Sequence, residues 1–274
     1  MPRGKSTPGR PGGARRAARG RGERRGVVRL PLARIPAGTR QILPGVLEFE
    51  DRSPLTFGGK GFLVVGPKYN VLVDTPACTP RVIQAVRACG GLRYIFLSHR
   101  DEIGELQLLR RALGGAVIAH RSEAQLVRGG ADLVFDQDFE VEPGMWVVHT
   151  PGHSPGSACL LLHRGELKVL FTGDHVLRRR AGVPAPLKFP WTWDWDAQVA
   201  SARRLLDLDF DYLVPSHDDR LPHGWFDDAR VRLTKALLDP VVTRGAAPRG
   251  AAGGGHVSAD RPLARGRKPR PTRS

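Results

Sequence analysis

The sequence predicts an α+β fold, a four-layer αββα sandwich in which two mixed sheets pack face to face and helices cover their outer faces. Two observations predict it. Short β-branched runs alternate with amphipathic stretches from Leu30 to Leu238, and the expected strands fall into two groups that are each interrupted and closed by helices. The same alternation also fits a single doubly wound sheet, so periodicity alone leaves two architectures open.

The first group of expected strands is short and apolar, and it is interrupted by two amphipathic helices. A helix over 80–88 is predicted because Val82 and Val86 recur at helical spacing, and a second is predicted from Leu106 to Leu113. The strands of this group are expected at 45–49, 62–65, 70–73, 94–97 and 116–119.

The second group contains strands that are separated by Gly and Pro turns and closed by helices. The strands are expected near 146–149, 158–162, 169–172 and 212–214. A helix over 197–206 precedes the last of them, and a final helix is expected over 226–238.

Positive charge is concentrated near the two ends of the sequence. Residues 1–26 contain nine Arg and Lys residues against Glu23, and residues 244–274 contain eight against Asp260, so these segments hold almost all of the formal net charge of +16. Both are rich in Gly, Pro, Ala and Arg, which predicts disordered basic tails around one domain over 27–243. Such tails either bind polyanions weakly and non-specifically or are simply solvated.

The remaining composition favours a cytoplasmic protein. The sequence shows no signal-peptide apolar region and no apolar run of the roughly 20 residues that a membrane span needs. Cys78, Cys89 and Cys159 are widely spaced and form no Cys-x-x-Cys pair, which is typical of thiols in a reducing compartment. We therefore expect no membrane partner.

His and Asp residues recur where predicted strands end. His99 and Asp101 follow one strand, His153 lies in a Pro-Gly turn, and Asp174 and His217 follow two later strands. Because loops at one edge of a sheet can converge, we expect these side chains to bind a metal ion. Imidazole and carboxylate ligands suit zinc, iron or manganese. A lone His is more often structural, but five such residues in this order are hard to explain by chance.

Two other features have both a functional and a structural interpretation. Trp191, Trp193 and Trp195 alternate, so on an extended segment they would share one face. That face either forms an aromatic wall for an acyl or ring-bearing substrate or packs the loop on the sandwich. Asp74 lies at a strand-to-helix turn, where it either caps the helix or orients a metal ligand.

The order of these segments resembles the metallo-β-lactamase superfamily. Val71–Pro76 is similar to its early strand with Asp, His149–Ser157 to its third motif, Leu170–Asp174 to its fourth and Leu213–His217 to its fifth. The resemblance covers residues 45–220. It implies the αββα fold, a metal site at one edge of the sandwich, and hydrolysis of an ester, thioester, lactone, amide or phosphodiester.

The second motif of that family, whose usual form is His-x-His-x-Asp-His, is incomplete here. The chain reads Ser-His-Arg-Asp-Glu-Ile-Gly over 98–104. If the strand end is the anchor, His99 is the first His and Asp101 stands where the second belongs. In the rival alignment His99 is the second His and Glu102 replaces the third. Strand geometry favours the first alignment, and under either one two usual ligands are lost and an acidic residue gains a place.

The resemblance implies one or two divalent ions. The four side chains expected to hold one ion are those of His99, Asp101, His153 and Asp174. His217 would complete the site or bind substrate, and a second ion would need Asp174 as a bridge, His217, and help from Glu102 or Glu105.

The expected activity is hydrolysis of a small ester or thioester by metal-activated water. The family's water-orienting Asp is missing, so Asp101 or Glu102 is the candidate base. Two alternatives remain open at this point. One is a non-hydrolytic or degenerate relative with an iron redox centre or a binding function, and the other is a nucleic-acid-associated protein that uses its basic tails.

Overall fold

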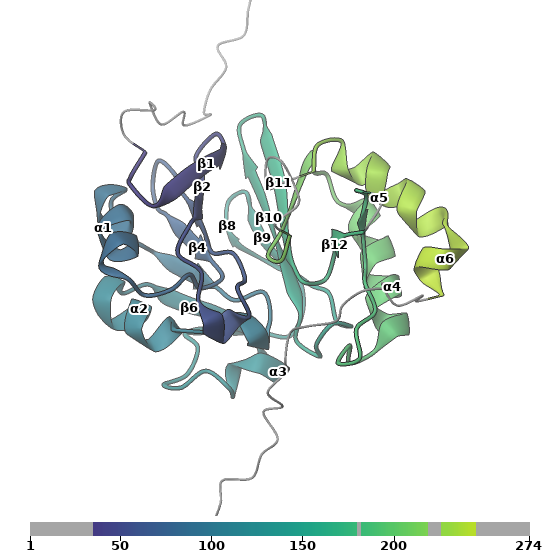
Figure 1. Cartoon of the computed structure of the whole chain (residues 1–274), viewed down its shortest axis with the longest axis horizontal. Coiled ribbons are helices and arrows are strands. Elements are labelled where there is room, and N and C mark those ends of the chain that lie inside the picture. The colour runs from purple at the N-terminus through teal and green to yellow at the C-terminus, as the bar shows by residue number, and fades with distance from the viewer. Residues whose placement is uncertain (1–34, 180–181, 219–225, 245–274) are drawn as a thin grey trace, which may run out of the picture.

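The computed structural model describes residues 35–179, 182–218 and 226–244, so the two expected tails lie outside the described residues apart from Arg244. Two β-sheets lie face to face, and helices cover the outer face of each (Figure 1). The predicted αββα sandwich is thereby confirmed, and the single doubly wound sheet is excluded.

The larger sheet has seven strands that lie side by side in chain order. They are β1 (Thr39–Leu43), β2 (Val46–Phe49), β3 (Phe62–Val64), β4 (Val71–Val73), β5 (Tyr94–Phe96), β6 (Ala116–His120) and β7 (Leu133–Phe135). The pairs from β1 to β4 are antiparallel, and those from β4 to β7 are parallel. Parallel pairing of β4 and β5 places the segments after them, Asp74 and Ser98–His99, at the same edge.

The second sheet has the order β14-β11-β10-β9-β8. Its strands are β8 (Phe139–Glu142), β9 (Met145–His149), β10 (Ala158–Arg164), β11 (Leu167–Gly173) and β14 (Tyr212–Pro215). β11 and β14 pair in parallel, so Asp174 and His217 follow their strands at a common edge. A separate pair is formed by β12 (Leu177–Arg178) and β13 (Pro184–Ala185).

Helices complete the two outer layers (Figure 1). Those of the first half are α1 (Pro80–Ala88), α2 (Leu106–Leu113) and α3 (Arg121–Ala124), and those of the second are α4 (Trp195–Arg204), α5 (Ala229–Leu238) and α6 (Pro240–Thr243). Short 3-10 helices lie at η2 (Pro54–Thr56), η3 (Arg100–Glu102) and η4 (Leu205–Asp207). No helix in the described ranges is long and apolar enough to cross a lipid bilayer.

The ends of the helices follow local chemistry. Thr79 caps α1, since its hydroxyl accepts a hydrogen bond from the Val82 amide, and Asp194 caps α4 in the same way. The expected start of the last helix at 226 is wrong. Phe226 instead forms a β-bridge with Leu213, and α5 begins three residues later.

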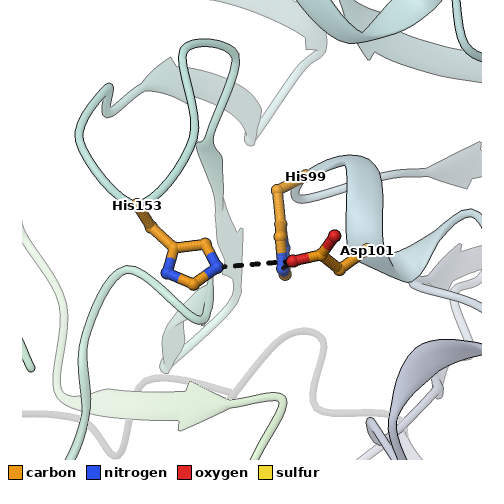
Figure 2. Close-up of side chains that lie close together, drawn as sticks. All are labelled: His99, Asp101 and His153. Carbon is orange, nitrogen blue, oxygen red and sulfur yellow. Dashed lines mark ion pairs between the residues drawn. The ribbon is translucent and has the colours of Figure 1, made fainter. Parts of the chain in front are cut away.

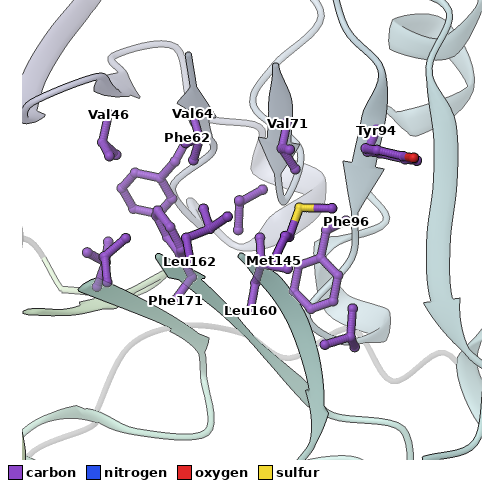
Figure 3. Packing of buried hydrophobic residues seen from close by; sticks show 14 of the residues in the cluster. Val46, Phe62, Val64, Val71, Tyr94, Phe96, Met145, Leu160, Leu162 and Phe171 are labelled. Atoms are coloured by element: carbon purple, nitrogen blue, oxygen red, sulfur yellow. The ribbon is translucent and has the colours of Figure 1, made fainter. Parts of the chain in front are cut away.

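Several strands are buried on both faces, and this explains why the sequences of these strands are almost continuously apolar. In β3, Phe62 and Val64 point between the sheets, while Leu63 packs under the helices of the first half. In β11, Phe171 meets Phe62 across the interface at 5.6 Å between ring centroids, and Leu170 faces the helices of the second half. Figure 3 shows this central layer, to which both sheets contribute side chains. The packed core fixes the strand ends from which the site is built.

Candidate metal centre

The side chains predicted to bind metal meet at one edge of the sandwich. The segments that carry them follow β5, β11 and β14 or form the turn between β9 and β10. Figure 2 shows His153 approaching from the second sheet toward His99 and Asp101, which follow a strand of the first. Residues more than 50 positions apart in sequence are thus brought together by the packing of the two sheets.

Four of the predicted ligands converge. Asp101 Oδ2 lies 3.7 Å from Nε2 of both His99 and His153. Asp174 Oδ2 lies 3.8 Å and 4.0 Å from the same two nitrogens. One ligand atom each of His99, Asp101 and His153 lie within 4.8 Å of one another and form a candidate group for one ion, and Asp174 faces the same two imidazoles.

The unsatisfied atoms and the charges at this point fit a cation. His99 Nε2 is buried and has no hydrogen-bond partner among the described residues. Burial, followed by the nearby His153, lowers the pKa of His99 to about 4, so its lone pair is available at neutral pH. Burial alone would raise the pKa of Asp101 and of Asp174. Nearby histidines outweigh it and hold the pKa of both carboxyl groups below the ordinary value.

A buried chain of hydrogen bonds orients His99. Asp74 accepts from the Ser98 amide at 2.7 Å and from the Ser98 hydroxyl at 2.9 Å. The same hydroxyl oxygen lies 3.0 Å from His99 Nδ1, which leaves Nε2 directed at the site. Asp74 is held in the left-handed region at φ 58°, a conformation that costs on the order of 1–3 kcal/mol outside glycine. The capping interpretation of Asp74 is wrong, since Thr79 caps α1, and the geometry agrees with the orienting one.

The second carboxylate oxygen of Asp174 faces a different pair of groups. Oδ1 accepts hydrogen bonds from the Ser216 hydroxyl and from His217 Nδ1, both at 2.7 Å. His217 Nε2 donates to the Thr56 carbonyl at 3.0 Å. Burial would lower the pKa of His217, but the charges of Asp174 and Glu102 outweigh it and raise that pKa to about 10. His217 therefore lies beside the four converging residues as a hydrogen-bonded imidazolium, and its role as a ligand stays a prediction.

Glu102 is the most unusual acid of the site. Its side chain is fully buried, and neither carboxylate oxygen has a hydrogen-bond donor in the described part of the chain. Oε1 lies 3.6 Å from His217 Nδ1. Burial, followed by the charge of Asp74, raises the pKa of Glu102 well above its ordinary value. A Cβ on Gly59 would lie only 2.4 Å from Oε1, so glycine is required there for Glu102 to point inward.

The two acids after Asp101 have separate roles. His99, Glu102 and Asp174 form a second group whose ligand atoms lie within 4.8 Å of one another. Glu105, by contrast, accepts hydrogen bonds from the Ser53 hydroxyl at 3.0 Å and the Cys78 amide at 3.1 Å. Of the two acids considered for a second ion, Glu102 is therefore the one that faces the centre.

Glu123 is a supporting residue that the sequence did not indicate. It belongs to α3 and is buried, and its Oε1 accepts from the Ser154 hydroxyl at 2.7 Å and the Gly156 amide at 2.9 Å. Oε2 lies 3.5 Å from Nε of Arg100. One carboxylate thus connects the turn that carries His153 with the segment that carries His99 and Asp101. Its local sequence does not distinguish Glu123 from a solvated surface acid.

Replacing Glu123 by glutamine is expected to weaken metal binding by about tenfold, because residues that support metal ligands typically contribute 10- to 100-fold. Glutamine can accept the hydrogen bonds of Ser154 and Gly156 only through its one carbonyl oxygen, and it carries no negative charge to pair with Arg100. Titration calorimetry with Zn²⁺ and Mn²⁺ measures the effect. Glu166→Gln, in an exposed turn, is the matched control and should bind as the wild type does. Equal affinities for both variants would remove Glu123 from the site.

His175 follows Asp174 and is buried, with neither ring nitrogen paired among the described residues. Burial, followed by His153, lowers its pKa to about 3 from the ordinary 6.5. In the unfolded chain, His175 therefore binds a proton below about pH 6.5, whereas in the folded protein it stays neutral down to about pH 3. This group is expected to remove about 2 kcal/mol of unfolding free energy between pH 7 and pH 5. Urea denaturation of the metal-free protein measures the unfolding free energy at pH 7 and pH 5. Between these values, His175→Leu should lose about 2 kcal/mol less than the wild type does. Equal losses in the two proteins would contradict the prediction.

The alternating tryptophans separate in the structure. Trp195 begins α4 and donates from Nε1 to the Thr243 carbonyl at 3.0 Å, so its expected place on a common aromatic face is wrong. Trp191 and Trp193 remain 42% and 55% exposed on the loop that precedes α4.

Comparisons with known proteins agree with the geometry. The model of the metallo-beta-lactamase superfamily matches residues 57–217, a segment that contains every predicted ligand. A metallo-β-lactamase from Hirschia baltica is similar in structure, with a TM-score of 0.54 and 19% identity over 75% of this chain and 99% of that chain. DIM-1 metallo-β-lactamase gives a TM-score of 0.57 and 18% identity over 73% of this chain and 94% of that chain.

A third similar structure is a Cronobacter sakazakii metallo-β-lactamase described by its HARLDQ motif. It gives a TM-score of 0.54 and 20% identity over 74% of this chain and 91% of that chain. At such identities the likeness concerns the fold alone. No curated protein sequence matches this chain significantly.

Proposed function

The chain belongs to the metallo-β-lactamase superfamily, and from this premise we propose that it is a metal-dependent hydrolase that cleaves a small ester or thioester. The observation that supports the proposal is that one carboxylate oxygen of Asp101 and one of Asp174 each lie 3.7–4.0 Å from the Nε2 atoms of both His99 and His153. Imidazole and carboxylate ligands of this kind suit an iron or manganese ion, whose higher coordination number would leave positions for water and substrate.

His99, Asp101, His153 and Asp174 would hold the ion. When bound, such an ion lowers the pKa of a water molecule and polarises the scissile carbonyl group. Two carboxylates among four ligands shift the preference toward iron or manganese relative to a site of three imidazoles. We propose a single ion, because His217 supplies a positive charge on the other side of Asp174 and both of its ring nitrogens are engaged.

Asp101 and Glu102 were both candidates for the base, and the geometry separates them. Asp101 Oδ2 is directed at both imidazole nitrogens, which favours a ligand role. Glu102 carries a buried carboxylate with no hydrogen-bond donor within the described ranges, next to the ligands. Its raised pKa makes it a stronger proton acceptor than an exposed glutamate. We assign it the proton released by the attacking water.

Elemental analysis and a hydrolysis assay test the proposal together. The purified full-length protein is expected to carry about one zinc, manganese or iron ion per chain, and to hydrolyse phenyl acetate or an acetyl thioester. Dialysis against a chelator should abolish the activity, and addition of the same metal should restore it. Protein that binds none of these metals at a stoichiometric level contradicts the proposal. Activity that survives chelation contradicts the metal-dependent mechanism.

A further inference from the structure

Two aromatic rings lie stacked beside the candidate metal centre. Phe189 and Trp191 have ring centroids 5.0 Å apart and ring planes 9° from parallel. Phe189 meets the ring of His153 edge to face, at 6.4 Å and 88°. The stack therefore begins at a predicted metal ligand and ends at Trp191, which is 42% exposed.

The loop that carries this pair is attached to the turn that carries His153. The Trp193 amide donates to the His153 carbonyl at 3.1 Å, and the Asp194 amide donates to the Gly152 carbonyl at 3.0 Å. Within the loop, the Phe189 amide donates to the Thr192 hydroxyl at 2.9 Å. The ring pair is therefore held in a fixed position relative to the metal ligand, which lowers the ordering cost of binding.

Gly152 is necessary for this attachment. Its φ is 144°, and a Cβ there would lie 2.2 Å from the backbone of Gln198 in α4. The turn with His153 can therefore lie directly against the start of α4 and the loop before it. The same contact fixes the distance between the metal ligands and the aromatic pair.

Trp195 packs the loop, since it is partly buried and hydrogen-bonded to Thr243. Trp191, stacked on Phe189, is 42% exposed, so a ligand can reach this side of the pair from solvent. Stacked rings offer a planar face, and planar groups stack on aromatic side chains with a preference beyond simple burial of area.

We propose that the Phe189–Trp191 pair is the recognition platform of the site, and that it binds an aromatic ring of the ester or thioester substrate. The proposal rests on the proposed hydrolytic function and names its substrate class. The ring can belong to the acid or to the alcohol or thiol half of the ester, because both halves are bonded to the carbonyl carbon at the ion.

The test compares three esters with the metal-loaded full-length protein. Phenyl acetate carries its ring on the alcohol half, methyl benzoate carries it on the acid half, and ethyl acetate has no ring. Trp191→Ala is expected to raise KM about fivefold to tenfold for whichever aromatic ester is preferred, and to leave kcat and the kinetics with ethyl acetate within twofold. Trp191→Phe, which keeps a planar ring, should stay within about threefold of wild type.

Trp193→Ala is the matched control, because Trp193 is an exposed tryptophan of the same loop whose backbone contact with His153 survives the substitution. It should change KM by less than twofold. Equal effects of Trp191→Ala and Trp193→Ala, or a rise in KM for ethyl acetate as large as for the aromatic esters, would overturn the assignment.

A binding measurement separates this inference from the proposed function. Acetanilide and N-methylbenzamide, the amide counterparts of the two aromatic esters, are titrated into chelator-treated protein and followed by NMR. Weaker binding to Trp191→Ala than to wild type supports the platform even if no ester is hydrolysed. Equal binding to both proteins overturns the platform, even if hydrolysis is confirmed.

Discussion

Replacing His153 by alanine is expected to lower the affinity for Zn²⁺ or Mn²⁺ by on the order of 10³-fold and to abolish ester hydrolysis. The imidazole Nε2 lies within 4.0 Å of both converging carboxylates. Without it, two negatively charged side chains and one imidazole would remain, and the ion would lose one of the two ligands that the second sheet contributes. Titration calorimetry measures the affinity, and elemental analysis of protein purified without added metal measures retention.

His163→Ala is the control for this prediction. His163 lies on β10, and its Nε2 contacts the Asp209 carbonyl at 2.7 Å rather than any residue of the site. This variant should bind metal and hydrolyse ester within twofold of the wild type. If His153→Ala retains both its metal and its activity, the four side chains are not the metal centre, and the hydrolytic proposal fails with them.

The layer order could be predicted from the sequence because strands buried on both faces have a simple signature. Phe62–Val64 and Leu167–Gly173 are almost continuously apolar, and amphipathic helices follow each group of strands. The weaker strands escaped prediction for the opposite reason. β7 and β8 are short edge strands: β7 has three residues, β8 contains two Glu residues, and the segment between them is Asp-Gln-Asp. Such segments resemble loops when tertiary pairing is unknown.

The candidate ligands could be predicted because each lies at a recognisable strand end or turn. Of the residues that support them, Asp74 had two open interpretations in the sequence, and Glu123 could not be predicted. Asp74 reaches His99 only through Ser98, and Glu123 connects two segments that are far apart in sequence. Both acids of the incomplete second motif belong to a candidate metal group. Asp101 Oδ2 lies 3.7 Å from Nε2 of both His99 and His153, while Glu102 Oε1 lies 3.6 Å from Nδ1 of His217.

The different directions of Asp101 and Glu102 give this edge two candidate metal groups, although two usual imidazoles are missing. Adjacent residues in the 3-10 helix η3 project their carboxylates to different sides of Asp174. One carboxylate joins the ligand set, and the other stays without a hydrogen-bond donor among the described residues. Under the proposed function, this second acid, whose Oε1 lies 3.6 Å from His217 Nδ1, would take the proton of the attacking water.

Glu102→Gln is accordingly expected to lower kcat by about 10²- to 10⁴-fold, the contribution typical of a positioned base, while metal affinity stays within about threefold. The amide keeps the volume of the side chain but cannot accept the proton that leaves the attacking water. Steady-state hydrolysis of phenyl acetate and metal titration are measured on the same preparation. Glu105→Gln, three residues further along, should retain activity because that carboxylate is bound to Ser53 and Cys78. If Glu102→Gln loses its ion in proportion to its activity, Glu102 is a metal ligand, and the base must be sought elsewhere.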